Sequence, residues 1–246
     1  NYGCIPMLVD ATDDLNFDLI SLNNKINVNT SAIIIVHLWG IPIDTRKIFE
    51  IAKDNNLKII EDASHSYGSK FNGQFIGSLG LVGCFSLQGS KPIAAGEGGI
   101  CVTNSKNIKE RLEFYGHFGR LNDKSYSQIS LYSDKTGYGK KLRANPLGLR
   151  LAQVDLSFFN LTNKIRLKNF NILQKIFAHN DLFKNINFSK HIIPGGFFGG
   201  FPLIYLKDDA DTILEIFKKF NIKIYKNPYF NLNKSEHIIN DEVRNK

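Results

Sequence analysis

The stretch VGCFSLQGSKPIAAGEGGICVT, residues 82–103, contains two short apolar runs separated by small and polar residues. Apolar runs of this length with turn-forming residues at their ends are typical of buried strands. The segment between them carries one lysine, Lys91, followed by three glycines around Glu97. Because glycine lets a backbone approach a ligand closely, the stretch predicts two strands joined by a loop that presents Lys91 to a bound molecule.

The residues before this stretch alternate strand and helix patterns. Apolar runs at residues 32–36 and 57–61 predict two more strands, and residues 45–56 and 107–116 have helical spacing. The expected N-caps are Asp44 for the first helix and Asn104 or Ser105 for the second. Apolar strands separated by helices indicate an α/β fold with a mostly parallel sheet covered on both faces. Ligands of such sheets gather at the carboxyl ends of the strands.

The second half of the chain has a different pattern. Its predicted elements are a polar, turn-rich segment at residues 119–145, a helix at 146–180, a strand at 201–206, a helix at 209–220 and a strand at 222–226. Gly148 disfavours the start of the long helix. We expect a large cofactor-binding domain at residues 1–144, and a connecting helix with a small α+β domain at residues 145–246.

Composition excludes several classes of protein. Hydrophobic residues make up 43% of the chain, enough for a sizeable core. The net charge is +8, but the basic residues are scattered, whereas a nucleic-acid groove needs clustered positive charge. The apolar runs are too short to span a membrane. Cys4, Cys84 and Cys101 lack zinc-site spacing and fit free thiols in a reducing compartment, so no metal and a cytoplasmic location are expected.

Four residues near the ends of the predicted strands form one chemical set. Each alone has a structural reading, because strand-end aspartates often cap turns and lone histidines and serines are usually structural. Together, Lys91, Asp62, His65 and Ser86 fit a pyridoxal phosphate site. A lysine amine forms a Schiff base with the cofactor carbonyl, and the ring nitrogen needs an acidic partner such as Asp62. His65 can lie against the ring or bond its oxygen, and Ser86 can donate to the phosphate.

The sequence resembles the DegT/DnrJ/EryC1/StrS aminotransferases, which act on sugars and have the pyridoxal phosphate fold-type-I architecture. The resemblance covers most of the chain and is carried by five blocks, PMLVDATDDLNFD, AIIIVHLWGIPID, LKIIEDASHSYGSKFNGQFIGSLGLVGCFSLQGSK, AGEGGICVTN and KLRANPLGLRLAQVD. It implies that Lys91 is the catalytic lysine, that Asp62 binds the ring nitrogen, and that Ser86 binds the phosphate. His65 matches the position beside the ring, and His37 and Glu97 match positions lining the active site.

The resemblance also implies a reaction and an assembly. An amino group from glutamate or glutamine would pass through the cofactor to a ketosugar, either a nucleotide-linked sugar or a cyclitol. The product would serve surface-polysaccharide or amino-sugar biosynthesis. Some relatives carry histidine in place of the lysine and catalyse dehydration, so Lys91 favours transamination. Family active sites lie between subunits, which implies a homodimer.

The chain departs from the family pattern in two ways. Family chains extend upstream of the first residues and beyond the last, and the upstream segment contributes a phosphate-binding helix start and a ring-stacking aromatic residue. Lys141, followed by Arg143, stands where many relatives have an asparagine that reaches the neighbouring subunit's phosphate. The resemblance places both residues in the active-site lining, where a lysine could contact the phosphate as a point charge. An alternative is therefore a non-catalytic remnant or split subunit that acts through interaction or regulation. A dinucleotide-binding enzyme is disfavoured, because no Gly-x-Gly-x-x-Gly follows a strand.

Overall fold

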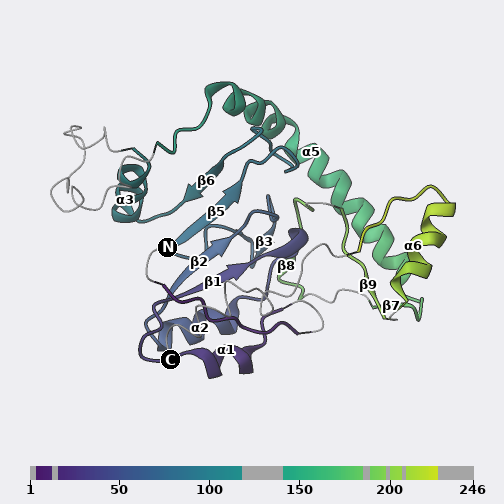
Figure 1. The fold of residues 1–246 in the computed structure, drawn as a ribbon, viewed down its shortest axis with the longest axis horizontal. Coiled ribbons are helices and arrows are strands. Elements are labelled where there is room, and N and C mark those ends of the chain that lie inside the picture. The colour runs from purple at the N-terminus through teal and green to yellow at the C-terminus, as the bar shows by residue number, and fades with distance from the viewer. Residues whose placement is uncertain are drawn as a thin grey trace. The chain divides into compact units, whose positions relative to one another are not determined.

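A computed structural model describes residues 4–12, 16–117, 141–184, 189–197, 200–206 and 209–226 of the 246-residue chain (Figure 1). The helices are α1 (Leu19–Lys25), η1 (Leu38–Gly40), α2 (Arg46–Asp54), α3 (Lys106–Gly116), α5 (Pro146–Phe177) and α6 (Ala210–Lys219). The strands are β1 (Ala32–Val36), β2 (Lys58–Asp62), β3 (Lys70–Phe71), β4 (Gln74–Phe75), β5 (Val82–Ser86), β6 (Gly99–Val102), β7 (Phe183–Lys184), β8 (Ile192–Ile193) and β9 (Ile204–Tyr205). Within these described ranges, no helix combines the length and apolarity needed to cross a bilayer.

The main sheet has the strand order β1-β2-β5-β6 (Figure 1). The first three strands are parallel, and β6 is antiparallel to β5. The predicted α/β fold with a mostly parallel sheet is confirmed, and each of the four strands lies within one residue of its apolar run. β2 ends at Asp62 and β5 ends at Ser86, so these two side chains lie at the same carboxyl edge of the sheet.

One row of residues crosses the whole sheet in register. Val36 pairs with Asp62, Asp62 with Cys84, and Cys84 with Cys101. Directly paired residues on neighbouring strands project from the same face of a sheet. The acidic residue expected to bind the cofactor therefore shares one face with two thiols.

The helices of the first half begin close to their predicted caps. The Ser105 hydroxyl accepts the N–H of Ile108 at 3.3 Å, which confirms one of the two expected caps of α3. Asp44 was expected to cap the preceding helix, but Thr45 holds the cap position of α2, so that prediction is wrong by one residue. Asp44 instead accepts the backbone N–H of Arg46 and pairs with its guanidinium, which satisfies the same helix end from one position further out.

The chain divides into two compact units. One consists of Asn29–Leu173 and Asn187–Pro202 and contains the main sheet; the other consists of Asn1–Val28, Gln174–Ile186 and Leu203–Lys246. The domain boundary expected after residue 144 stays a prediction, and most of the predicted polar segment at 119–145 lies outside the described residues.

The strand predicted at residues 222–226 is wrong, because this segment is irregular. Ile222 donates its N–H to the carbonyl of Phe217 at 3.0 Å. This bond holds the backbone of residue 222 against the last turn of α6, so the segment does not extend away from the helix as a strand would.

Candidate active site

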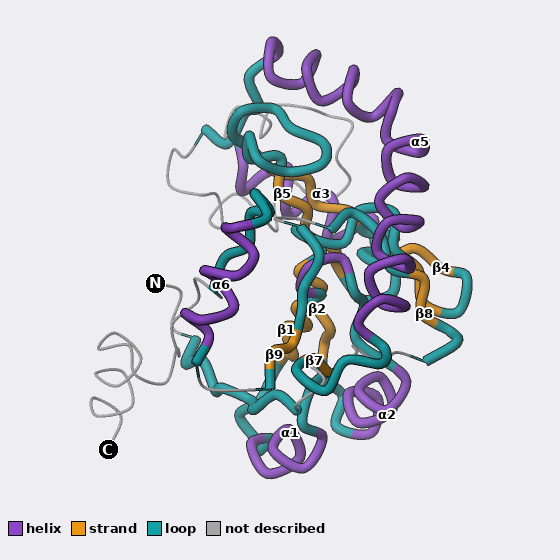
Figure 2. Tube along the Cα trace, turned by 90° about the vertical axis from the view of Figure 1, so that its right-hand side faces the viewer, coloured by secondary structure: helices purple, strands orange, loops and turns teal. Residues whose placement is uncertain are grey.

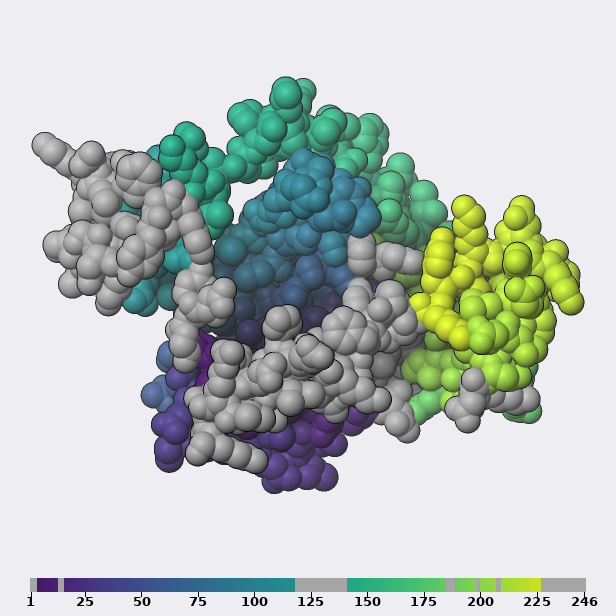
Figure 3. All heavy atoms as spheres, in the orientation of Figure 1, coloured from purple at the N-terminus to yellow at the C-terminus, as the bar shows by residue number. Residues whose placement is uncertain are grey.

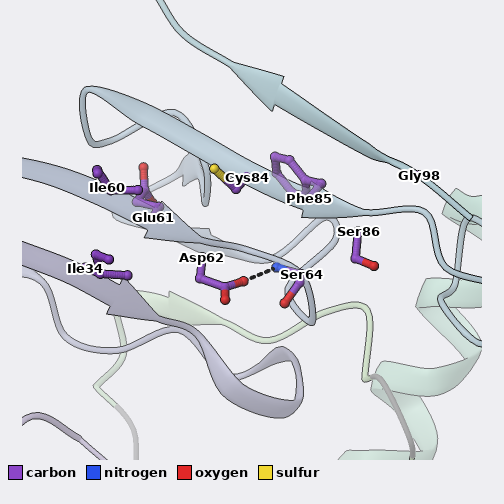
Figure 4. Close-up of a pocket in the computed structure, with 9 residues that line it drawn as sticks. All are labelled: Ile34, Ile60, Glu61, Asp62, Ser64, Cys84, Phe85, Ser86 and Gly98. Carbon is purple, nitrogen blue, oxygen red and sulfur yellow. Dashed lines mark hydrogen bonds between the residues drawn. The ribbon is translucent and has the colours of Figure 1, made fainter. Parts of the chain in front are cut away.

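A pocket of about 410 Å³ opens at the carboxyl edge of β2 and β5 (Figure 4). Its lining residues are Ile34, Ile60, Glu61, Asp62, Ser64, Cys84, Phe85, Ser86 and Gly98. Small-molecule sites have this range of volume and combine apolar walls with a few placed polar groups. Two of the residues that the sequence predicts as cofactor ligands, Asp62 and Ser86, therefore lie in one pocket.

Asp62 is held at the mouth of the pocket by the turn that follows its strand. Its Oδ1 accepts the backbone N–H of Ser64 at 3.0 Å (Figure 4). Its own carbonyl accepts the N–H of His37 at 3.1 Å, which ties the end of β2 to the residue after β1. The side chain is half-buried, so the backbone bond orients the carboxylate toward the space over the sheet edge.

Ser86 is positioned by contacts on both sides of its strand end. Its hydroxyl oxygen accepts the N–H of Gln88 at 3.3 Å, which leaves the O–H to donate to a ligand. Its carbonyl accepts the phenolic O–H of Tyr67. Tyr67 is buried, with its ring centroid 5.2 Å from that of Phe85, and burial raises its pKa. Tyr67 therefore acts as a neutral hydrogen-bond donor that fixes the end of β5.

Lys91 lies in a loop that folds back on itself. Its N–H donates to the carbonyl of Gln88 at 2.8 Å, and the loop closes where Leu87 exchanges backbone bonds with Ala95 and Gly98 at 2.7 and 2.9 Å. Burial lowers the pKa of Lys91, while the negative charge of Asp62 opposes that change. The two groups are therefore close enough for their charges to interact, and the amine loses its proton more readily than a solvent-exposed lysine.

Helix α5, at the right of Figure 2, contacts this loop through Asp155. The Asp155 carboxylate accepts the N–H of Ala94 at 3.0 Å. Gly148 is buried in the first turn of the helix, and a Cβ at that position would lie 2.3 Å from the carbonyl oxygen of Ala95. The glycine that disfavours a helix in the sequence therefore permits close packing of α5 on the loop that carries Lys91.

His65 is buried beside these groups in its neutral form. Burial and, to a smaller extent, the charge of Lys91 lower its pKa to about 4, and the charge of Asp62 acts in the opposite direction. Its Nδ1 accepts the backbone N–H of Trp39 at 3.3 Å. Because a neutral imidazole has one protonated nitrogen, the hydrogen of His65 resides on Nε2.

The other predicted site residues do not line the pocket. His37 is fully buried against Glu61, and Glu97 is exposed next to the pocket residue Gly98. Lys141 is exposed and forms an isolated β-bridge with His117, and Arg143 is exposed as well. Their roles at the active site remain predictions.

Several residues that shape the site could not be identified from the sequence. Tyr67 and Ser64 lie in a turn whose composition is ordinary, and Asp155 lies 61 residues beyond the amide that it binds. Cys84 appeared only as an apolar strand residue. Each acts through a contact between segments that the chain brings together only in the folded state.

Comparison with known proteins identifies similar sequences and folds. The model of the DegT/DnrJ/EryC1/StrS aminotransferase family matches residues 1–244. GDP-perosamine synthase of Escherichia coli O157:H7 is 32% identical over 180 residues, which are 71% of this chain and 48% of that protein. The UDP-N-acetyl-3-dehydro-α-D-glucosamine 3-aminotransferase of Acidithiobacillus ferrooxidans is 35% identical over 142 residues, which are 57% of this chain and 37% of that protein.

A solved structure shares the fold. The GDP-4-keto-6-deoxy-D-mannose-3-dehydratase of Escherichia coli, crystallised with bound hydrated pyridoxal phosphate, aligns with a TM-score of 0.78 at 24% identity. The alignment covers 95% of this chain and 62% of that one. The present chain thus spans about half of the length of the relatives it matches, or less.

Proposed function

This chain belongs to the DegT/DnrJ/EryC1/StrS aminotransferase family, and we propose that it binds pyridoxal phosphate at Lys91 and transfers an amino group to a ketosugar. One observation carries the proposal. Asp62 and Ser86 line one pocket at the carboxyl edge of the sheet, and the Lys91 amine lies within electrostatic range of Asp62.

The residues of the pocket fit this cofactor by their chemistry. The Asp62 carboxylate is an acceptor for a protonated ring nitrogen, and the Ser86 hydroxyl is a donor for a phosphate oxygen. Neutral His65 offers its Nε2–H to a ring oxygen. Burial lowers the pKa of the Lys91 amine, which favours the neutral form that reacts with a carbonyl. These four residues would hold the cofactor.

Bound pyridoxal phosphate supplies a carbonyl that reacts with amines and a ring that accepts electrons from a neighbouring carbon. The residues of the chain then perform the remaining tasks. Lys91 moves the proton at the reacting carbon, since its lowered pKa brings it closer to neutral pH than an ordinary lysine. The Asp62 carboxylate would accept a hydrogen bond from the ring nitrogen, and Asp155 holds the backbone of the Lys91 loop.

The substrates follow from the family and from the relatives. Glutamate or glutamine is the amino donor, and the acceptor is a nucleotide-linked ketosugar or a related cyclitol. The names of the two relatives, which contain GDP and UDP, support the nucleotide-linked class. The product enters surface-polysaccharide or amino-sugar synthesis in the cytoplasm, and the three free thiols are consistent with that reducing compartment.

A homodimer completes the proposed enzyme. Helix α5 presents many exposed apolar side chains, and the face shown in Figure 3 has α5 at its surface. These residues are Leu147, Leu149, Leu151, Val154, Leu156, Phe158, Leu161, Ile165, Ile172 and Ile176. So many exposed apolar side chains on one helix favour a protein interface. Light scattering of the whole chain is expected to give twice the chain mass, and a monomer at working concentration would contradict the dimer.

The proposal is tested by trapping the cofactor. The purified chain is mixed with pyridoxal phosphate, its visible spectrum is recorded, and borohydride reduction is followed by peptide mass spectrometry. A yellow adduct located on Lys91 is expected, and Lys91→Ala should abolish it whereas Lys53→Ala, which removes an exposed lysine of α2, should not. Saturable cofactor binding with Lys91 unmodified, or no specific adduct in the whole chain, would overturn the assignment and favour the non-catalytic alternative.

A further inference from the structure

Two cysteines face each other across the antiparallel pair β5 and β6. Cys84 and Cys101 are direct register partners, and their sulfur atoms are 4.0 Å apart. Direct partners in antiparallel strands have Cα atoms about 4.5–5.5 Å apart, which lies inside the range of about 4.4–6.8 Å that disulfides span. Rotation of the side chains can therefore join the two sulfurs while the strands stay paired.

We propose that Cys84 and Cys101 are a modification site, a reversible disulfide that forms on the sheet face that also carries Asp62. Cys101 is exposed, whereas Cys84 is half-buried in the pocket next to Asp62 (Figure 4). An oxidant from solvent therefore reaches Cys101 first, and Cys84 is the thiol that resolves the product.

The two steps balance with a peroxide as the oxidant. The Cys101 thiolate attacks hydrogen peroxide, an S–O bond forms as the O–O bond breaks, and the departing hydroxide takes a proton to become water. The Cys84 sulfur then attacks the Cys101 sulfur, an S–S bond forms as the S–O bond breaks, and the second water carries away the Cys84 proton. Burial and the neighbouring Cys101 raise the pKa of Cys84 to about 11, consistent with Cys84 as the second thiol to react.

The disulfide would clamp the loop that holds Lys91. Cys84 and Cys101 are 17 residues apart, and the segment between them contains Ser86, Lys91 and Gly98. A covalent link at its two ends reduces the conformational freedom of that segment. It also converts the thiol of Cys84, the register partner of Asp62, into a disulfide sulfur. The inference stands on the strand pairing and the sulfur positions, so it holds whether or not the chain binds pyridoxal phosphate.

Thiol counting in the whole reduced chain tests the proposal. The chain has three cysteines, so three thiols should react with a disulfide reagent after denaturation. Brief treatment with hydrogen peroxide should reduce the count to one, and dithiothreitol should restore three. Peptide mass spectrometry should find residues 84 and 101 in one cross-linked pair that has lost two hydrogen atoms.

Matched variants identify the thiols involved. Cys4→Ser should fall from two reactive thiols to none, whereas Cys101→Ser should keep both of its thiols under the same treatment. Three thiols remaining in the wild-type chain would overturn the proposal. A cross-link between chains through Cys4, or a Cys101 sulfinic acid beside an intact Cys84 thiol, would overturn it as well.

Discussion

The imidazole of His37 faces the carboxylate of Glu61, with 3.4 Å between Nε2 and Oε2, and both side chains are fully buried. His37 Nδ1 accepts the N–H of Ile43 at 3.2 Å, so the ring carries a proton on Nε2, the nitrogen nearer the carboxylate. Glu61 immediately precedes Asp62 in β2, so this buried pair anchors the strand end that positions the candidate cofactor aspartate.

Glu61 also organises the turn that follows β4. Its two carboxylate oxygens accept the backbone N–H groups of Gly77, Leu79 and Gly80 at 2.9, 2.7 and 2.6 Å. These bonds give each of the three amides an acceptor. They also replace the hydrogen bonds to water that the Glu61 carboxylate loses on burial. The Glu61 carboxylate therefore holds this turn in place beside the pocket that Glu61 helps to line.

Replacement of Glu61 should destabilise the fold strongly. Glu61→Ala removes the acceptor of three amides and of the His37 ring, so the free energy of unfolding should fall by about 3–5 kcal/mol. Glu61→Gln keeps the shape and one carbonyl acceptor, so its loss should be smaller. Urea denaturation of the three proteins measures both values. If the unfolding free energy of Glu61→Ala lay within about 1 kcal/mol of the wild-type value, this structural role of Glu61 would be contradicted.

The same carboxylate should give the fold an acid-sensitive component. Burial is the largest single influence and raises the pKa of Glu61, but bonds from His37 and from the Gly80 and Gly77 amides outweigh it, so the pKa lies below 4.5. A group with a lowered folded-state pKa stabilises the fold above its unfolded value and loses that contribution as pH falls through the folded value. The unfolding free energy should decline from pH 4.5 downward, and less steeply in Glu61→Gln. Equal slopes would argue against this origin.

Gly148→Ala should displace the loop that carries Lys91. The added Cβ would meet the Ala95 carbonyl at 2.3 Å, and the helix and the loop cannot both keep their positions. We expect a loss of about 1–3 kcal/mol of stability and weaker adduct formation at Lys91. Gly116→Ala, at the end of α3, is the matched control, because its Cβ would make only an ordinary 3.7 Å contact with the side chain of Leu142. Identical adduct yields in the two variants would refute the packing argument.

Asp155 should affect the same loop through a hydrogen bond. Asp155→Ala leaves the Ala94 amide without its charged acceptor, which should lower stability by about 1–3 kcal/mol and reduce the yield of the Lys91 adduct. Asp155→Asn retains a side-chain carbonyl and should restore part of both properties. The comparison requires a cofactor titration beside a thermal melt. A variant that melts lower but binds the cofactor normally would limit Asp155 to a structural role.

The sequence predicted the sheet better than the site because the two depend on different ranges of contact. Each of the four strands is a local apolar run, and parallel pairing then places the ends of β2 and β5 at one edge. The bond from the Ala94 amide to Asp155 and the bond from the Tyr67 hydroxyl to Ser86 each join segments that are distant in the sequence. A local sequence pattern does not reveal such contacts. His37 matched a family position, but its burial against Glu61 could be learned only from the fold.

His65 should remain neutral well below its usual titration range. Its pKa of about 4 results first from burial and then from the charge of Lys91, with Asp62 opposing both. In the cofactor-free chain, the imidazole NMR signals of His65 should therefore titrate with a midpoint near pH 4. Since the unfolded chain binds a proton at His65 near pH 6.5, this residue should destabilise the fold as pH falls from 6.5 toward 4.

Two variants separate the causes of that shift. Lys91→Ala removes a positive charge, so the pKa of His65 should rise, but burial should keep it below 6.5. Asp62→Asn removes a negative charge that favours the protonated ring, so the pKa should fall further. A midpoint near 6.5 in the wild-type chain, or shifts of the same sign in both variants, would show that His65 does not share the local field of Lys91 and Asp62.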